Sequence, residues 1–137
     1  MENQSLSTME NQKSAIGLDG NLAAAIGYPI GIIALILIFI EKENKFVRFH
    51  AIQSILWGVL ATIAWIVVFI VGAVLGLILA QILGATIAWG IWALTIFLFV
   101  VIFLGWFGGF IMAAVKAYGN NQYSLPIIGK YAAKWSA

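Results

Sequence analysis

A long stretch without charge is the feature that most limits what this chain can fold into. Residues 49–115 contain no Asp, Glu, Lys or Arg. Hydrophobic residues make up 64% of the whole chain and charged residues 9%, whereas soluble domains have roughly 45–50% and about 25%. This composition excludes a soluble globular protein and indicates one all-α membrane domain.

The apolar stretches are long enough to cross a bilayer. A hydrocarbon core of about 30 Å requires roughly 20 apolar residues in a helix. We therefore predict three transmembrane helices, at about 21–40, 46–80 and 86–117. Four spans are the alternative, because residues 49–115 could hold three helices with almost no loops. Pro29 lies inside the first predicted span and predicts a kink there.

The positions of the cations favour three spans and set an orientation. Lys and Arg in short loops concentrate on the cytoplasmic side of a membrane. The two groups of cations are Lys42, Lys45 and Arg48, and Lys116, Lys130 and Lys134. Both groups lie inside only if an even number of spans separates them. We expect a multi-pass protein of the cell inner (plasma) membrane, with its N-terminus outside and its C-terminus in the cytoplasm.

The chain divides into three predicted segments. Residues 1–20 are polar, residues 21–118 form the helical membrane domain, and residues 119–137 form a cytoplasmic tail. The first residues, Met-Glu-Asn-Gln, recur from Met9, so either the recurrence is chance or Met9 is an alternative start. The tail is expected to contain a short amphipathic helix at the membrane surface. One face carries Ile127, Ile128, Tyr131 and Trp135, and the other carries Lys130 and Lys134.

Small residues recur at a spacing that suits close helix packing. In lipid, helices associate where small side chains let their backbones approach. The glycines concerned are Gly27 and Gly31 in the first span, Gly72 and Gly76 in the second, and Gly105 and Gly109 in the third. They could close the bundle or form a homo-oligomer.

The segment around Arg48 is the richest in polar groups. On a helix, Lys45, Arg48 and Phe49 fall on one side, while His50 and Gln53 point elsewhere, into the bundle. The expected anionic-lipid contacts are Lys42, Lys45, Arg48, Lys130 and Lys134. His50 and Gln53 could line a groove for a substrate or partner, or they could form an interhelical clamp with partners such as Asn21 or Tyr28.

The sequence offers no recognisable catalytic chemistry. Cysteine is absent, and a lone histidine makes no credible metal site. No paired nucleophile and base and no glycine-rich phosphate loop can be identified. We expect no enzyme activity, no cofactor, no metal site and no nucleic-acid binding.

Three motifs carry a family resemblance. They are Tyr28-Pro29, the run from Glu41 to Ser54 with Arg48-Phe49-His50-Ala51-Ile52-Gln53 at its centre, and Leu125-Pro126-Ile127-Ile128-Gly129. The chain resembles a family of small bacterial and archaeal membrane proteins without assigned chemistry. That family is similar to the twenty-kilodalton Tic subunit of chloroplast inner-envelope protein import. The resemblance marks Arg48, His50 and Gln53, and Pro126 and Gly129 in the tail, as functional or structural positions.

Two functions of different kinds remain open. One is a helical scaffold or accessory subunit of a membrane complex, linked by the resemblance to protein translocation and in contact with a membrane-protein partner or with its own copies. The other is an oligomeric pore or small-solute transporter lined by His50, Gln53 or Gln81.

Overall fold

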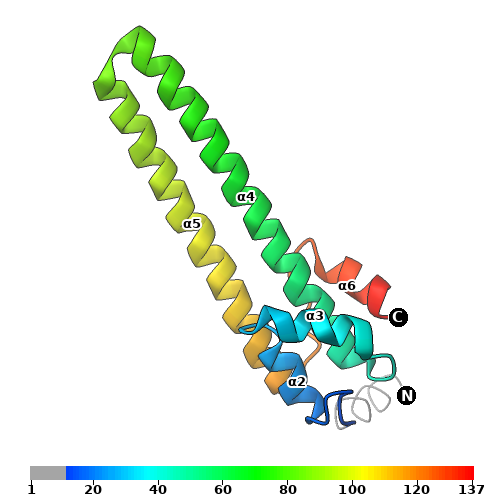
Figure 1. Ribbon diagram of the computed structural model, residues 1–137. Helices are drawn as coiled ribbons and strands as arrows, with labels where there is room; N and C mark the ends of the chain where they lie inside the picture. The colour runs from blue at the N-terminus through cyan, green and yellow to red at the C-terminus, as the bar shows by residue number, and fades with distance from the viewer. Residues whose placement is uncertain (1–11) are drawn as a thin grey trace. The chain divides into compact units, whose positions relative to one another are not determined.

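The computed structural model describes residues 12–137 and is helical throughout its regular elements (Figure 1). Residues 1–11, and with them Met9, lie outside the described residues. The helices are α2 (Gly20–Ile26), α3 (Gly31–Ile40), α4 (Lys45–Leu83), α5 (Ala85–Tyr118) and α6 (Gly129–Ser136). From residue 12 onward there is no strand, only an isolated bridge between Lys13 and Asp19.

Helices α4 and α5 confirm the two long helices predicted in the charge-free region. They contain 39 and 34 residues, about 58 and 51 Å at 1.5 Å per residue, and both are long and apolar enough to cross a membrane. Gly84 alone separates them, with φ of +90°, a conformation that glycine adopts without steric cost. The alternative of three helices between residues 49 and 115 is wrong.

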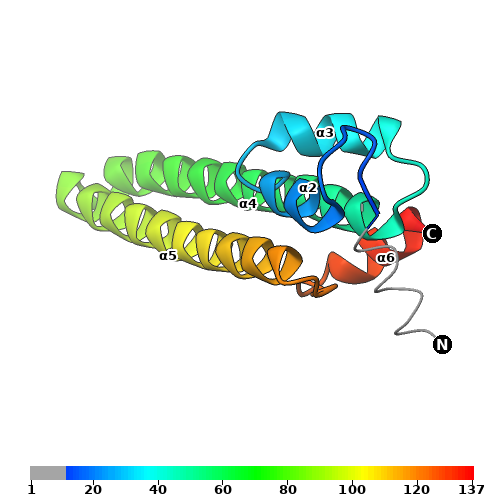
Figure 2. The same ribbon diagram turned by 90° about the horizontal axis from the view of Figure 1, so that it is seen from below.

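The prediction of one continuous span over residues 21–40 is wrong. This stretch forms two helices of 7 and 10 residues, α2 and α3, which lie side by side in two views (Figure 2). Pro29 has no backbone N–H, and its ring disfavours a helical residue before it. The consequence is a break at Gly27–Ile30, where a kink within a continuous helix was predicted. Neither helix alone is long enough to cross a bilayer.

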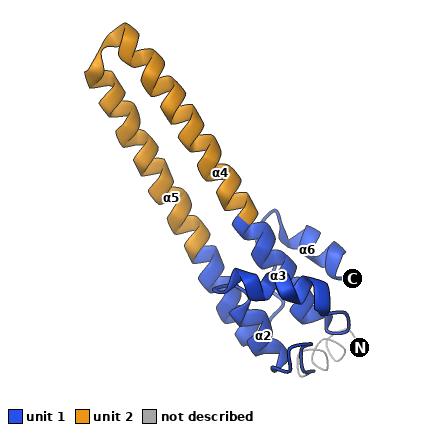
Figure 3. Cartoon of the chain, in the orientation of Figure 1, with its two compact units in different colours: residues 1–58, 108–137 blue, residues 59–107 orange. Residues whose placement is uncertain are grey.

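The chain folds into two compact units (Figure 3). Unit 1 comprises residues 1–58 and 108–137, and unit 2 comprises residues 59–107. Unit 1 contains α2, α3 and α6. It also contains the first part of α4, up to Gly58, and the last part of α5, from Gly108. Unit 2 is a helical hairpin made of the rest of α4 and α5. This division differs from the predicted polar, membrane and tail segments, which stay predictions.

Unit 2 is held together where glycines of α4 meet side chains of α5. A Cβ added at Gly72 would overlap the Thr95 side chain, and one at Gly76 would lie 3.4 Å from Nε1 of Trp92. The Trp65 and Phe103 rings are stacked, with their centroids 6.4 Å apart. Most large apolar side chains of this hairpin are exposed, as expected for helices that face lipid.

Unit 1 begins α4 with a side-chain cap. Oδ1 of Asn44 accepts the Val47 N–H at 3.2 Å, the bond that satisfies a free amide at a helix start. Helix α6 packs against this part of α4, because Ala132 is buried in a cluster with Phe49 and Ile52. The predicted short tail helix is present, but it begins at Gly129, and its buried side consists of small residues.

The close approach at Gly72 generates a stability prediction. We expect Gly72→Ala to destabilise the hairpin by about 1–3 kcal/mol, because the added methyl group overpacks against Thr95. Thermal unfolding in detergent measures the effect. Gly105→Ala is the control, since an added Cβ there meets no other atom within 4 Å. Equal melting temperatures for the two variants would contradict this packing.

Candidate functional site

A buried glutamine joins three parts of unit 1. The amide nitrogen of Gln53, Nε2, donates to Tyr28 Oη at 2.8 Å and to the Tyr123 carbonyl at 2.9 Å. Its oxygen, Oε1, accepts the Leu125 N–H at 2.9 Å. The side chain is fully buried, so each of these bonds replaces water that cannot reach the site. Gln53 thereby links the α2–α3 break, α4 and the C-terminal loop.

Tyr28 connects Gln53 to His50. Its hydroxyl lies 3.0 Å from His50 Nδ1. Nδ1 of a neutral histidine ring can donate or accept in this contact, according to the tautomer. The His50 ring is enclosed edge-on by Phe46 and Phe49, with centroids 4.7 and 5.0 Å away. The histidine is therefore fixed in an apolar cage.

The C-terminal motif forms a tight turn that presents Leu125 to Gln53. Ile127 has φ of +68°, and the Gly129 N–H donates to the Leu125 carbonyl at 2.9 Å. A Cβ at Gly129 would lie 2.6 Å from Cβ of Ser124. Glycine is therefore required where α6 begins, and Pro126 lies within the same turn.

Arg48 is separate from this network. Among residues 12–137 its guanidinium has no hydrogen bond or ion pair to another side chain, and its Nε is buried without a partner. The structure thus brings together Tyr28, His50 and Gln53, with Phe49 against the histidine ring and Pro29 at the break beside Tyr28.

Sequence reasoning named Glu41 only as the first residue of a family motif and missed its structural role. Its carboxylate is buried, accepts the Asn44 N–H at 3.1 Å through Oε1 and the Ala15 N–H at 2.7 Å through Oε2. Asn44 Nδ2 also donates to the Gln12 carbonyl at 3.0 Å. The available signal was the Glu41-x-x-Asn44 spacing directly before a helix, since both residue types suit helix starts.

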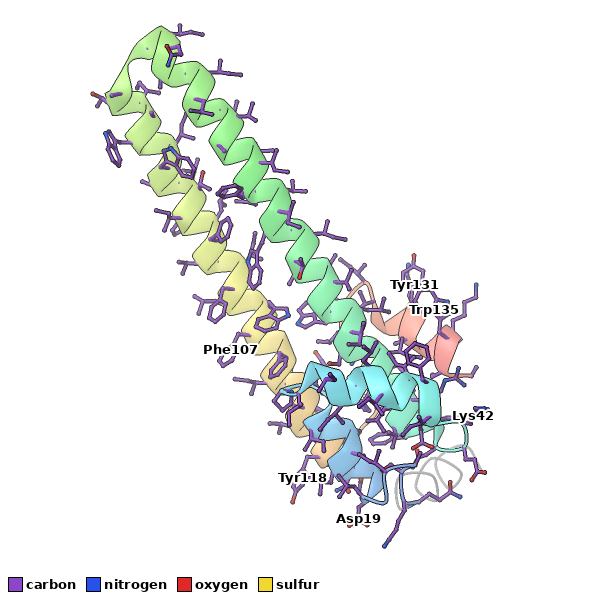
Figure 4. All side chains as sticks on the ribbon, viewed as in Figure 1. Asp19, Lys42, Phe107, Tyr118, Tyr131 and Trp135 are labelled. Atoms are coloured by element: carbon purple, nitrogen blue, oxygen red, sulfur yellow. The ribbon has the colours of Figure 1, made fainter. Side chains whose placement is uncertain are left out.

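Helix α6 exposes two aromatic rings beside its lysines. The ring centroids of Tyr131 and Trp135 lie 6.2 Å apart, and both side chains are exposed on the outside of unit 1 (Figure 4). Lys130 Nζ lies 5.2 Å from the Tyr131 ring centre. Ile128, which was predicted on the same face, is instead buried. The face with exposed rings suits a membrane interface, where aromatic and cationic side chains both find partners.

The predicted packing glycines fall into two groups. Gly27 lies near Ala34, and a Cβ at Gly109 would lie 2.7 Å from the Trp57 ring, so these two contact neighbouring helices within unit 1. A Cβ at Gly31 or Gly105 would meet no described atom within 4 Å. A side chain added at either position would enter open space among the described residues.

The arrangement is suited to holding segments together. In the part of the chain that the structure describes, no group of three or more His, Cys, Asp or Glu side chains could hold a metal ion. The hydrogen bonds of Gln53 and Tyr28 end on groups of the same unit. The absence of enzyme activity stays a prediction.

Known proteins are similar to this chain over most of its length. Residues 13–132 match the magnetosome magnetite crystal formation protein family. A UPF0132 membrane protein of the archaeon Methanocaldococcus jannaschii is 36% identical over 126 residues, which cover 90% of this chain and 94% of that protein. A second UPF0132 membrane protein of that organism is 29% identical over 122 residues, covering 88% and 73%. No solved structure matches the chain.

These findings correct the resemblance given above. The matched family is not the Tic-like one, and none of the similar proteins is named for protein import. Both archaeal relatives are named membrane proteins. The motifs around Arg48 and Gly129 therefore carry no link to protein translocation.

The buried amide generates a prediction for Gln53→Leu. This change leaves the Leu125 N–H and the Tyr123 carbonyl without partners, and each buried unpaired group costs about 1–3 kcal/mol. We expect a loss of at least about 2 kcal/mol in unfolding free energy, measured by thermal unfolding in detergent. The same change at exposed Gln122 is the control. Equal stability of the two variants would show that the Gln53 network contributes little.

Proposed function

Because the chain belongs to the magnetosome magnetite crystal formation protein family, a family with archaeal membrane proteins among its relatives, we propose that it is a helical scaffold or accessory subunit in a membrane complex. The single observation that carries this proposal is the Gln53 network. Tyr28, His50 and Gln53, which could have lined a site, are hydrogen-bonded to one another or to backbone groups inside unit 1. The long helices and α3 expose mainly apolar side chains, which suit lipid and neighbouring helices.

The scaffold acts by presenting surface to other helices. Gly105 on α5 has open space around it, and small residues are where helices approach closely in lipid. The occupant of this position is a membrane-protein partner or a second copy of the chain. No catalytic step belongs to this proposal.

The proposed location is the cell inner membrane with the C-terminus in the cytoplasm. Lys45 begins α4 and Lys116 lies in the last turn of α5. These helices form one hairpin, so two crossings return the chain to the side from which it entered. Cations at both ends of such a hairpin favour the cytoplasmic side.

The pore alternative has weaker support. His50 and Gln53 are fully buried within one chain, so they are not available to line a channel between copies. Thr95, inside the hairpin, donates to the Ile91 carbonyl of its own helix at 2.8 Å. Gln81, near the turn of the hairpin, is exposed, but one polar residue makes no path across a membrane.

The proposal does not extend mineral formation to this chain. The family description names magnetite crystals, and binding iron would require clustered carboxylate or histidine ligands. The described residues contain no such cluster. The scaffold role instead rests on the Gln53 network and on the apolar surface of the helices.

A bulky residue at an open glycine tests the scaffold. We expect Gly105→Leu to keep its own thermal stability but to recover a crosslinked partner or dimer at least several-fold less from native membranes, because the side chain blocks close helix approach. Ala93→Leu is the matched control, exposed on the same helix and about 120° away around the axis. Unchanged recovery with Gly105→Leu would contradict a partner at this face.

The cations of α6 generate a lipid prediction. We propose that Lys130 and Lys134, with Lys42, Lys45 and Arg48, bind anionic headgroups, at about 1 kcal/mol per cation. The double variant Lys130→Ala, Lys134→Ala should lower the preference for phosphatidylglycerol over phosphatidylcholine roughly thirtyfold, since each 1.4 kcal/mol is about tenfold. Native mass spectrometry of retained lipid measures it. The pair of Lys→Arg changes keeps the charge and should keep the preference; a loss there would rule out a simple charge effect.

A further inference from the structure

We propose that α2 and α3 form a re-entrant hairpin, which enters the membrane from the lysine-rich side and returns to that side. Residues 12–19 then lie on the same side of the membrane as the C-terminus. The apolar face of α3 contacts the acyl chains of that leaflet. This placement replaces the expectation of an N-terminus on the opposite side, and it is independent of the proposed scaffold function.

The two ends of the hairpin are joined by hydrogen bonds. The Ala15 N–H donates to Glu41 Oε2 at 2.7 Å, and Asn44 Nδ2 donates to the Gln12 carbonyl at 3.0 Å. If residues 21–40 crossed a hydrocarbon core of about 30 Å, the groups before and after them would lie on opposite surfaces. Hydrogen bonds of 2.7 and 3.0 Å between these groups therefore place both ends of the hairpin on one side of the membrane.

The end of α5 lies at the same place. Asn21, at the start of α2, donates through Nδ2 to the Tyr118 carbonyl at 3.0 Å. Figure 4 shows Asp19, Lys42 and Tyr118 at one end of unit 1. The segment before α2 is therefore tied to the loop before α4, and the start of α2 is tied to the last residue of α5.

The break between α2 and α3 marks how far the hairpin reaches along α4. Gly27 accepts the Ser54 hydroxyl through its carbonyl at 3.0 Å, and Tyr28 binds His50 and Gln53. Ser54 lies nine residues after Lys45, or about 14 Å along the helix, which is about half of a bilayer core. Non-helical backbone at such a depth is tolerated where protein covers it, as α4 does here.

The exposed side of α3 is apolar and has cations after it. Ile32 and Phe39 are 66% and 72% exposed, and Leu35 and Ile36 are exposed between them. Lys42 and Lys45 follow directly in the sequence, where ammonium groups would meet anionic headgroups. An apolar face that ends in cations complements one leaflet, so lipid is the occupant that we assign to it.

Cysteine labelling tests the sidedness. The natural chain has no cysteine, and Gln12→Cys, Gln81→Cys and Gln122→Cys each replace an exposed glutamine. We expect an impermeant maleimide to label Gln12→Cys and Gln122→Cys in the same vesicle orientation, inside-out or right-side-out, and Gln81→Cys in the other. Labelling of Gln12→Cys together with Gln81→Cys would show that residues 21–40 cross the membrane, and would overturn the proposal.

A second measurement tests the lipid face. Spin labels at Ile32→Cys and Phe39→Cys, in liposomes that contain only this protein, should be accessible to oxygen and protected from a water-soluble nickel chelate. A label at Lys42→Cys is the control and should show the reverse. Chelate access at Phe39→Cys would overturn the lipid contact. Neither measurement needs a partner, so failure of the scaffold function would leave both results intact.

Discussion

The need to satisfy the Gln53 amide governs how unit 1 is built. A primary amide that is shielded from water must find its donors and acceptors in the protein, because an unpaired one costs more than its hydrogen bonds contribute when made. Gln53 finds them on three segments, at Tyr28, Tyr123 and Leu125. These bonds fix the α2–α3 break and the C-terminal turn against α4. The caged histidine and the packing of α6 depend on that fixed geometry.

The long helices follow from the sequence, whereas the first apolar segment does not. Sixty-seven residues without charge leave helices as the means of pairing backbone groups in lipid, and the two groups of lysines indicate an even number of crossings. Residues 21–40 pass the same tests of length and apolarity. Their break depends on Pro29 together with distant partners, since Ser54 and Gln53 bind the groups at the break. Local sequence shows the proline but not the partners.

The sequence allowed the side chains of the candidate site to be predicted, but not their backbone partners. Tyr28, His50 and Gln53 stand out because polar groups in an apolar helix need partners, and their clustering agrees with an interhelical clamp. The backbone of Tyr123 and Leu125 could not be predicted as the other partner, because every residue carries the same amide group. Glu41 was missed for a related reason. In a loop of mixed charge its carboxylate looks solvated, yet it is buried against backbone N–H groups.

Unit 1 combines segments from both ends of the chain, and this determines when it can fold during synthesis. The bond between Gln53 and Leu125 joins residues 72 positions apart, and the whole hairpin of unit 2 lies between them in sequence. During synthesis the glutamine is therefore made long before its last partner, and its amide must remain solvated or bound elsewhere until the tail emerges. Unit 1 closes only after both long helices have been made. A chain that stops before Leu125 would lack the last partner of the Gln53 amide.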